Sequence, residues 1–370
     1  MGAYGSVGGY CLLRYLRIKE VVTYHEDSDL VGFGYNRDRK RGHEQIVISL
    51  LCNKDGCPVA VEVFPGGTKD ETTVVDKINE IKQEYGIEKV IFVGDRGMVT
   101  QAVYDKIDHA TVKTISALNH SNIQTLCDKG TIQMNLFDEE NIIEVIDEDK
   151  RYMLCKNPVM QLKETNTRNR LIELTCVELD KIIASTRKSK YSKVVRMGRK
   201  IDKYKMGKFI IIEGSDNNVS YRLDNERIEK EMILDGCYIV FTNVTSDDMS
   251  ALDTVKNYKS LIKVEQAFRS LKTTQLEMRP IFHKTDERIK CHVFICMLAY
   301  YIMWHMRQRL QPLEEIDGVG SNRRYSFAHV IESLKAIRIN DVNFMDTDTT
   351  VITTPTDEQA LLLNLLAVAV

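Results

Sequence analysis

Residues 89–97 read KVIFVGDRG, and this stretch decides how the rest of the chain is interpreted. Consecutive apolar and β-branched residues followed by glycine are typical of a short strand that is buried on both faces of a sheet. Asp95 would then stand at the carboxyl end of that strand, where the sheet holds the backbone and the carboxylate can point into a site. The alternative is an ordinary turn aspartate before Gly97.

The segment upstream predicts a hairpin and a helix. Residues 45–51 (QIVISLL) and 57–64 (CPVAVEVF) are strand-like, and residues 53–56 (NKDG) between them have turn chemistry. Residues 70–85 carry apolar side chains at helical spacing, and Gly86 fits a helix C-cap. The order β-β-α-β, ending in an acidic residue, indicates a mixed α/β core.

The segment downstream, residues 120–245, has a different pattern. A polar stretch at 168–205 predicts helix. Short strand-like pieces surround this stretch, at 132–136, 141–146, 151–155, 209–213, 219–223 and 237–243. We therefore expect a β-rich subdomain inserted into the core.

One long helix is predicted at residues 250–272. Tyr258, Glu265 and Lys272 are spaced by sevens, so that they form one stripe beside the apolar face of this helix. The alternative is a plain amphipathic helix in which Glu265 pairs with Arg269 four residues later. Further helices are expected at 286–309 and 327–337, and the apolar tail at 361–370 is expected to pack on the core or on a partner.

The overall charge argues against a globally basic nucleic-acid binder. The formal net charge is -2, so DNA contacts must come from local patches. Residues 187–208 form such a patch, with ten Lys or Arg against the single acid Asp202. Arg199 and Lys200 are our candidates for DNA binding there. The alternative is a solvated helical face.

Cysteines and apolar runs predict a cytoplasmic protein. The nine cysteines form no CxxC pair, which favours reduced thiols over a zinc site. The longest apolar run, residues 293–304, is shorter than the roughly 20 residues that cross a bilayer. No membrane span is therefore expected.

Three blocks of sequence resemble the DDE-type transposases of bacterial insertion sequences, in the subgroup with a Tyr-x2-Arg-x3-Glu-x6-Lys signature. They are residues 32–73 (beginning GFGYNRDRK), 90–102 (VIFVGDRGMVTQA) and 258–302 (beginning YKSLIKVEQAFRSLK). The resemblance covers about residues 29–310. It implies an RNase-H-like catalytic core, with a mixed sheet flanked by helices, that is interrupted by a mostly β insertion.

This resemblance also implies roles for individual residues. Asp95 matches the second catalytic aspartate, and Glu265 matches the catalytic glutamate. Such enzymes use two Mg²⁺ or Mn²⁺ ions held by three carboxylates to cut and join DNA strands. Tyr258 and Lys272 match signature residues expected to contact the DNA backbone, and Arg96 and Arg269 are weaker candidates for the same role. Leu261 stands where the signature has arginine.

The departure from the family lies at the front of the chain. The first catalytic aspartate is expected about a dozen residues before Ser28, where the sequence reads LLRYLRIKEVV and holds no aspartate. The nearest acids are Glu20, Asp27 and Asp29. We therefore expect a truncated or frame-shifted N-terminus, with ordered structure beginning near residue 45. Loss of the first core strand would expose a sheet edge.

The resemblance implies a transposase catalytic domain that acts on transposon ends and target DNA, and it also implies a homodimer. Two alternatives stay open: a non-catalytic, DNA-binding remnant of a transposase, and a hydrolytic nuclease of the same fold. The expected parts are a degenerate segment (1–28), two parts of the catalytic core (29–119 and 246–340), the insertion (120–245) and a C-terminal tail (341–370).

Overall fold

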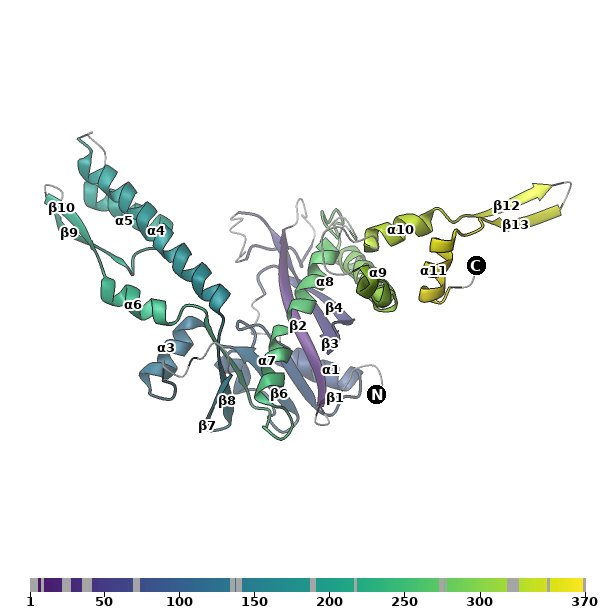
Figure 1. Cartoon of the computed structure of the whole chain (residues 1–370), viewed down its shortest axis with the longest axis horizontal. Helices are drawn as coiled ribbons and strands as arrows, with labels where there is room; N and C mark the ends of the chain where they lie inside the picture. The colour runs from purple at the N-terminus through teal and green to yellow at the C-terminus, as the bar shows by residue number, and fades with distance from the viewer. Residues whose placement is uncertain are drawn as a thin grey trace. The chain divides into compact units, whose positions relative to one another are not determined.

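The computed structural model divides the chain into two compact units. Unit 1 comprises Met1–Leu13 and Asp70–Leu261, and unit 2 comprises Arg14–Lys69 and Ile262–Val370. Both are drawn in Figure 1. The residues that the structure describes are 6–7, 10–21, 28–34, 42–68, 74–133, 137, 142–186, 191–215, 218–272, 276, 278–317, 326–344 and 347–368.

A mixed sheet forms the centre of unit 1. Its strands lie in the order β2-β5-β6-β11-β8-β7, and β2 (Tyr10–Val21) contributes Tyr10–Leu13 to this unit. Strands β5 (Val90–Gly94) and β6 (Val112–Ala117) are parallel, whereas β11 (Cys237–Thr242) runs antiparallel to both β6 and β8 (Lys150–Lys156). Strand β7 (Ile143–Asp147) pairs antiparallel with β8. All five residues of β5 are buried, as expected for a strand covered on both faces.

Short helices with polar caps connect these strands. Helix α1 (Val74–Glu84) precedes β5, and α2 (Gln101–Tyr104) follows it. Helix α3 (His120–Asp128) begins after Asn119, whose side chain accepts the backbone N–H of Asn122. Such caps satisfy backbone donors that the helix itself leaves unpaired.

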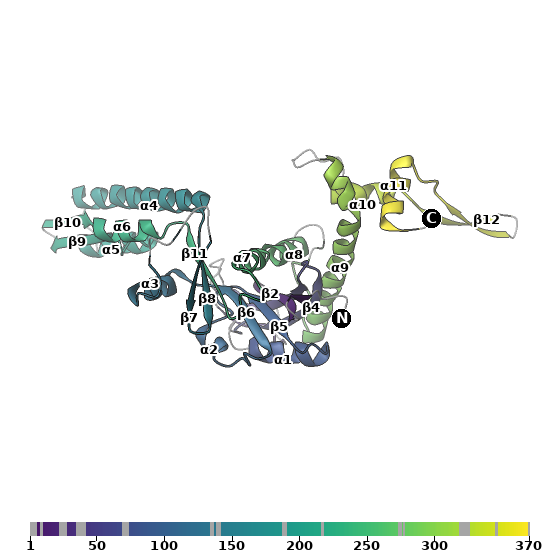
Figure 2. The ribbon, with the colours of Figure 1, turned by 60° about the horizontal axis from the view of Figure 1, so that its bottom comes forward.

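The inserted segment contains five of the six expected strands, but helices dominate it. Helix α4 (Pro158–Ala184) has 27 residues, and α5 (Lys193–Tyr204) has 12. Strands β9 (Ile210–Ser215) and β10 (Asn218–Leu223) form a hairpin, and α6 (Asn225–Ile233) follows. Figures 1 and 2 both show α4 lying along α5, β9 and β10.

The description of this insertion as β-rich is therefore too narrow. Apolar residues of α4, α5, β9 and β10 form a core of their own, which includes Leu179, Met197, Ile201 and Ile210. The strand expected at 132–136 lies mostly outside the described residues. Strands β7, β8 and β11 belong to the main sheet of unit 1, and Met153 and Cys155 of β8 and Val240 of β11 pack in its core.

Unit 2 is built on the predicted hairpin. Strands β3 (Gln45–Asn53) and β4 (Pro58–Pro65) pair antiparallel, and β2 lies beside β3. The turn chemistry works as predicted, since Asn53 Oδ1 accepts the backbone N–H groups of Asp55 and Cys57. Helices α8 (Ile262–Lys272) and α9 (Asp286–Asp317) pack on this hairpin through a shared apolar core.

The end of the chain forms a smaller cluster in unit 2. Helices α10 (Phe327–Lys335) and α11 (Asp357–Leu366) pack against α9. The buried residues are Leu310, Leu313, Val330, Leu362 and Leu366. The prediction that the apolar tail packs on the core is therefore confirmed for α11. Between the two helices lies an unpredicted hairpin, β12 (Ile339–Phe344) with β13 (Thr347–Ile352).

Two predictions about chain organisation were wrong. Ordered structure does not begin near residue 45, because β2 (Tyr10–Val21) is a strand of 12 residues with Leu12, Leu13 and Tyr15 buried. The helix predicted at 250–272 is two helices, α7 (Ala251–Lys259) and α8, separated at Ser260 and Leu261. The predicted fold class, a mixed α/β sheet flanked by helices, is confirmed.

Helix α9 is the one candidate for a membrane span among the described residues. Its segment Asp286–Leu313 is long and apolar enough by length and composition, and 33% of the most apolar window is buried. Ile289, Val293 and Met297 on this helix belong to the core of unit 2. We interpret α9 as a core helix for that reason.

Candidate functional site

Asp95 stands where the sequence predicted, directly after β5 in unit 1. It is half-buried, and its Oδ1 accepts the backbone N–H of Arg96 at 2.7 Å. The chain turns here, because the N–H of Met98 donates to the carbonyl of Asp95. A buried parallel strand and a tight turn therefore fix the backbone of Asp95, and the Arg96 side chain beside it is exposed.

Glu265 lies on the solvent side of α8 in unit 2. Val264, Ala267, Phe268 and Leu271 are buried on the other side of the helix and hold it in the core. Glu265 and Arg269 are both exposed, and no ion pair joins them in the described part of the chain. The alternative interpretation, an i,i+4 pair, is thus not what the structure shows.

The break between α7 and α8 changes the stripe that spacing predicted. Tyr258 belongs to α7 and packs at the edge of the unit 1 core. Glu265 and Lys272 belong to α8, and Lys272 is its last residue. Leu261, at the arginine position of the signature, is 7% exposed in the same unit 1 core as Tyr258. An apolar side chain buried there offers no phosphate contact.

The first carboxylate of the expected triad has no counterpart among the described side chains. Strand β2 instead carries Arg14, Tyr15 and Arg17 at its centre. Arg14 is 2% exposed, and its Nη1 donates to the carbonyl of Asn53 at 3.1 Å. Burial lowers the pKa of Arg14 to about 10, so the guanidinium stays charged at neutral pH. Arg17 Nε donates to the Tyr15 hydroxyl at 3.1 Å.

Three acids lie nearest to the position expected for the first catalytic aspartate: Glu20, Asp27 and Asp29. Glu20 lies in β2, with its side chain outside the described part. Asp27 is also outside the described residues, and Asp29 is exposed in a turn. Each unit contains one of the two named carboxylates, Asp95 in unit 1 and Glu265 in unit 2.

Carboxylate oxygens are the donors that Mg²⁺ and Mn²⁺ prefer. However, no group of three or more His, Cys, Asp or Glu side chains is placed to hold a metal ion among the residues that the structure describes. The donor chemistry therefore suits these ions, but the donor set is incomplete. All nine cysteines are free thiols. Cys296 Sγ and His292 Nε2 lie 3.9 Å apart within α9.

The two DNA-binding candidates on α5, Arg199 and Lys200, differ in how available their charges are to a phosphate. Lys200 Nζ forms an ion pair with Glu178 Oε2 at 2.5 Å, and the hydrogen bond from Lys200 lowers the pKa of Glu178 to about 2. Arg199 is exposed and stacks over the Tyr191 ring at 3.9 Å. Arg199 is therefore the better phosphate ligand, because the charge of Lys200 is already compensated. Arg187, also in the basic run, lies outside the described residues.

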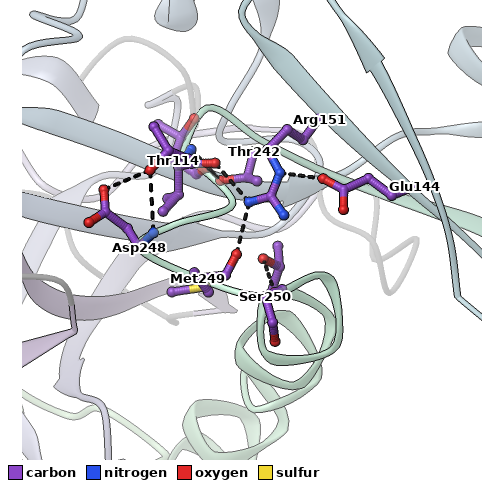
Figure 3. A network of polar contacts seen from close by, with 10 residues as sticks. Thr114, Glu144, Arg151, Thr242, Asp248, Met249 and Ser250 are labelled. Atoms are coloured by element: carbon purple, nitrogen blue, oxygen red, sulfur yellow. Dashed lines mark hydrogen bonds and ion pairs between the residues drawn. The ribbon is translucent and has the colours of Figure 1, made fainter.

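A buried arginine that the sequence analysis missed organises the segment before α7. Arg151 on β8 is 5% exposed and pairs through Nε with Glu144 on β7. Its Nη1 donates to the carbonyls of Val244 and Met249, at 2.9 and 3.0 Å. Figure 3 shows the guanidinium between these groups. The signal available in the sequence was an arginine beside the apolar run YMLC.

Threonine side chains complete this network. Thr242 Oγ1 donates to the carbonyl of Thr114 at 2.7 Å and accepts the N–H of Val244 at 3.0 Å (Figure 3). Thr245 Oγ1 donates to Asp248 Oδ2 at 2.9 Å. Ser250 then caps α7. The network holds the chain between β11 and α7 at several points, and so fixes where α7 begins.

A cavity of about 400 Å³ lies in unit 1 beside the turn that carries Asp95. Its polar lining includes Arg96, Thr100, Asn119 and Lys150. Lys150 Nζ is already engaged by Gln101 at 2.9 Å and by the Tyr104 ring at 4.1 Å. This cavity therefore offers Arg96 as its more available cation.

Comparison with known proteins gives a family and a distant structural likeness. The family model described as Transposase DDE domain matches residues 21–302, a range that contains Asp95 and Glu265 and begins at the last residue of β2. No curated protein matches the chain. One similar solved structure is described as "Cryo-EM structure of piggyBac transposase synaptic complex with hairpin DNA", with a TM-score of 0.40 and 5% identity.

That alignment covers 84% of this chain and 49% of the piggyBac transposase chain. The chain thus spans about half the length of that protein. The likeness is too weak to carry an argument about the site, which therefore rests on the family match and on the residues themselves.

Proposed function

Since the chain belongs to the transposase DDE domain family, we propose that it acts on DNA as the catalytic domain of a transposase, with Asp95 and Glu265 as two of its metal-binding carboxylates. The observation that carries the proposal is the family match over residues 21–302. Within that range, Asp95 ends a buried strand and Glu265 is exposed on a helix held in the core.

Members of this family depend on divalent metal ions. Two Mg²⁺ or Mn²⁺ ions are the proposed cofactors, and when bound they would stabilise charge at the attacking and leaving oxygens of a phosphodiester. The third carboxylate is missing from the described side chains, so the residues present do not complete this site. We therefore assign ligand roles to Asp95 and Glu265 and assign no step of the reaction.

The proposed DNA contacts follow from exposed or partly exposed cations. Arg96 lies beside Asp95, and Arg269 and Lys272 lie on the same helix as Glu265. Such side chains fix the register of a DNA backbone without reading its sequence. We include Tyr258 as a signature residue and Arg199 as the accessible cation of α5, and rank Lys200 below them. The proposed setting is a cytoplasmic homodimer on paired transposon ends.

A second function, DNA binding without catalysis, is favoured by one specific observation. The central residues of β2 are Arg14, Tyr15 and Arg17, where the family is expected to carry its first aspartate. A site with two carboxylates would hold metal more weakly. A hydrolytic nuclease is the third possibility, and it differs from a transposase in having no strand-transfer product.

The test is cleavage of the element's own end DNA in the presence of Mg²⁺ or Mn²⁺. The informative variants are Asp95→Asn and Glu265→Gln, and the matched control is Glu229→Gln, another exposed glutamate on a helix. We expect cleavage by the wild type and the control and none by the two site variants. Joining of a 3′-hydroxyl end to target DNA would then identify a transposase rather than a hydrolytic nuclease.

Three other outcomes would contradict the proposed function or the residues assigned to it. A folded chain that binds the end DNA and leaves it uncut with both ions would support the non-catalytic function. Cleavage that survives in both site variants would remove Asp95 and Glu265 from the site. A folded chain that binds no DNA would overturn the proposal as a whole.

A further inference from the structure

A large cavity lies within unit 2, apart from the cavity beside Asp95 in unit 1. It has a volume of about 820 Å³ and is bounded by the β3–β4 turn, α8 and α9. The turn is built close to α8: Gly56 has φ +85°, and a Cβ placed there would lie 2.9 Å from the Cβ of Lys263. A side chain at this position would therefore meet α8, which makes the turn a close-fitting wall of the cavity.

The charge of the lining is positive. Lys263 and Arg269 come from one side of α8, Arg307 comes from α9, and Asp55 is the one acid in the lining. Lys263 and Arg269 are exposed, and neither has an ion-pair partner in the described part of the chain. Arg307 lies over the Phe327 ring at 5.0 Å. Two of the three cations are therefore available to an anionic ligand.

The remaining lining suits a nucleobase. Trp304, the single tryptophan of the chain, is half-buried in the wall, and the amide side chains of Gln266, Gln308 and Gln311 line the same cavity. Burial raises the pKa of Tyr300 to about 12, so its hydroxyl stays protonated at neutral pH. Aromatic rings provide stacking surfaces, and amides can donate to and accept from base edges.

The combination of cations, one indole and several amides is typical of sites for single-stranded nucleic acid. The volume falls within the roughly 300–1,000 Å³ of pockets that hold a small-molecule-sized group. This is room for a base with its phosphates and too little for a duplex. Arg269 is also one helical turn after Glu265, so a strand bound here would pass close to that carboxylate on α8.

We propose that this cavity holds one unpaired strand of DNA, with its phosphates against Lys263 and Arg269 and a base stacked on Trp304. The inference rests on the proposed function, because it takes DNA as the ligand. It adds to that function a defined site for a single strand, lined by residues to which the sequence analysis assigned no role apart from Arg269.

Trp304 makes a direct test possible, because all tryptophan fluorescence of the chain comes from this residue. The probe is an oligothymidylate added to the full-length protein, compared with the same strand annealed to oligodeoxyadenylate. We expect saturable quenching by the single strand and much less by the duplex. Anisotropy of the labelled oligothymidylate, measured in parallel, reports binding anywhere on the protein.

Two sets of cavity variants sharpen the test. Trp304→Ala should weaken binding of the single strand about tenfold, at the lower end of the effect of a stacking aromatic, and Trp304→Phe should retain most of the affinity. Lys263→Gln combined with Arg269→Gln should lower the slope of log affinity against log salt by about 1.4, since each phosphate contact contributes about 0.7 for single strands.

The matched control is Arg288→Gln combined with Lys290→Gln, which removes two exposed charges of α9 that do not line the cavity. The proposal is overturned if the control pair lowers affinity and salt slope as much as the cavity pair does. It is also overturned if anisotropy shows binding while the fluorescence of Trp304 stays constant, and in that case the proposed function stands. Absence of any DNA binding overturns the proposed function itself, and the cavity proposal with it.

Discussion

Strands β5 and β2 are both largely buried, but their charged residues lie at different places: after the end of β5 and within β2. Strand β5 is apolar throughout and presents its carboxylate, Asp95, only after the strand has ended. Strand β2 carries Arg14 and Arg17 within the strand, where Asn53 and Tyr15 accept hydrogen bonds from them. Arg17 also lies over the Phe64 ring at 4.7 Å.

This difference indicates a different role for each strand. A charge placed inside a buried strand has to be compensated by its own surroundings, and so it serves stability. A charged residue at the end of a strand has its backbone fixed by the sheet, while its side chain stays accessible. By this comparison β2 is a structural strand, and β5 is a strand that carries a residue of the proposed site.

The largest expected effect is on stability and comes from Arg14. Arg14→Ala should lower the free energy of unfolding by about 3 kcal/mol, because it leaves a cavity and removes the donor to the Asn53 carbonyl. Arg14→Met should cost less, since it keeps most of the volume and removes the buried charge. Urea denaturation measures both, with exposed Arg288→Ala as the control, expected within about 0.5 kcal/mol of wild type.

If Arg14→Ala behaves like the control, Arg14 is not a structural group, and β2 is not the structural strand that the comparison makes it.

A smaller effect is expected for the buried arginine of β8, which extends the comparison to unit 1. Arg151→Gln should lower the free energy of unfolding by about 2 kcal/mol, because the carbonyls of Val244 and Met249 lose a charged donor. Hydrogen exchange should show faster exchange in the segment before α7 than elsewhere in unit 1. Glu144→Gln, which keeps an acceptor on the half-exposed β7, is the matched variant and should cost less.

Uniform acceleration of exchange across unit 1 in Arg151→Gln would contradict the local role of this network.

The smallest effect on stability is expected for Asp95 itself. Asp95→Asn should change the free energy of unfolding by less than about 0.5 kcal/mol, because an amide oxygen can still accept the N–H of Arg96. The same variant should abolish cleavage. Measured together, the two quantities separate a site residue from a structural one. A loss of stability close to that of Arg14→Ala would place Asp95 with the structural charges of β2.

The elements that the sequence predicted well are those with local, repeated signals. The β3–β4 hairpin follows from Asn53 and Gly56, β5 from its apolar run, and the start of α9 from acids in its first turn. The strand pieces of the insertion follow from the same kind of signal. Asp95 and Glu265 remain predictions as site residues, and the structure places Asp95 directly after β5 and Glu265 on the exposed side of α8.

The elements that sequence analysis misread depend on contacts between distant residues. Strand β2 was missed because Arg14 and Arg17 interrupt its apolar pattern, and their partner Asn53 is 39 residues from Arg14. The break between α7 and α8 carries neither glycine nor proline, and Leu261 is buried in the unit 1 core while α8 belongs to unit 2. The β12–β13 hairpin was missed because exposed polar strands show little alternation.

By itself, the sequence determined the family and the order of the main elements and indicated two candidate carboxylates, because periodicity, turn chemistry and motif spacing are properties of neighbouring residues. Only the tertiary structure decided that β2 belongs to the sheet, that Arg151 anchors the segment before α7, and that Lys263, Arg269, Arg307 and Trp304 share one cavity. Those facts depend on burial and on partners far apart in the chain, which no local pattern encodes.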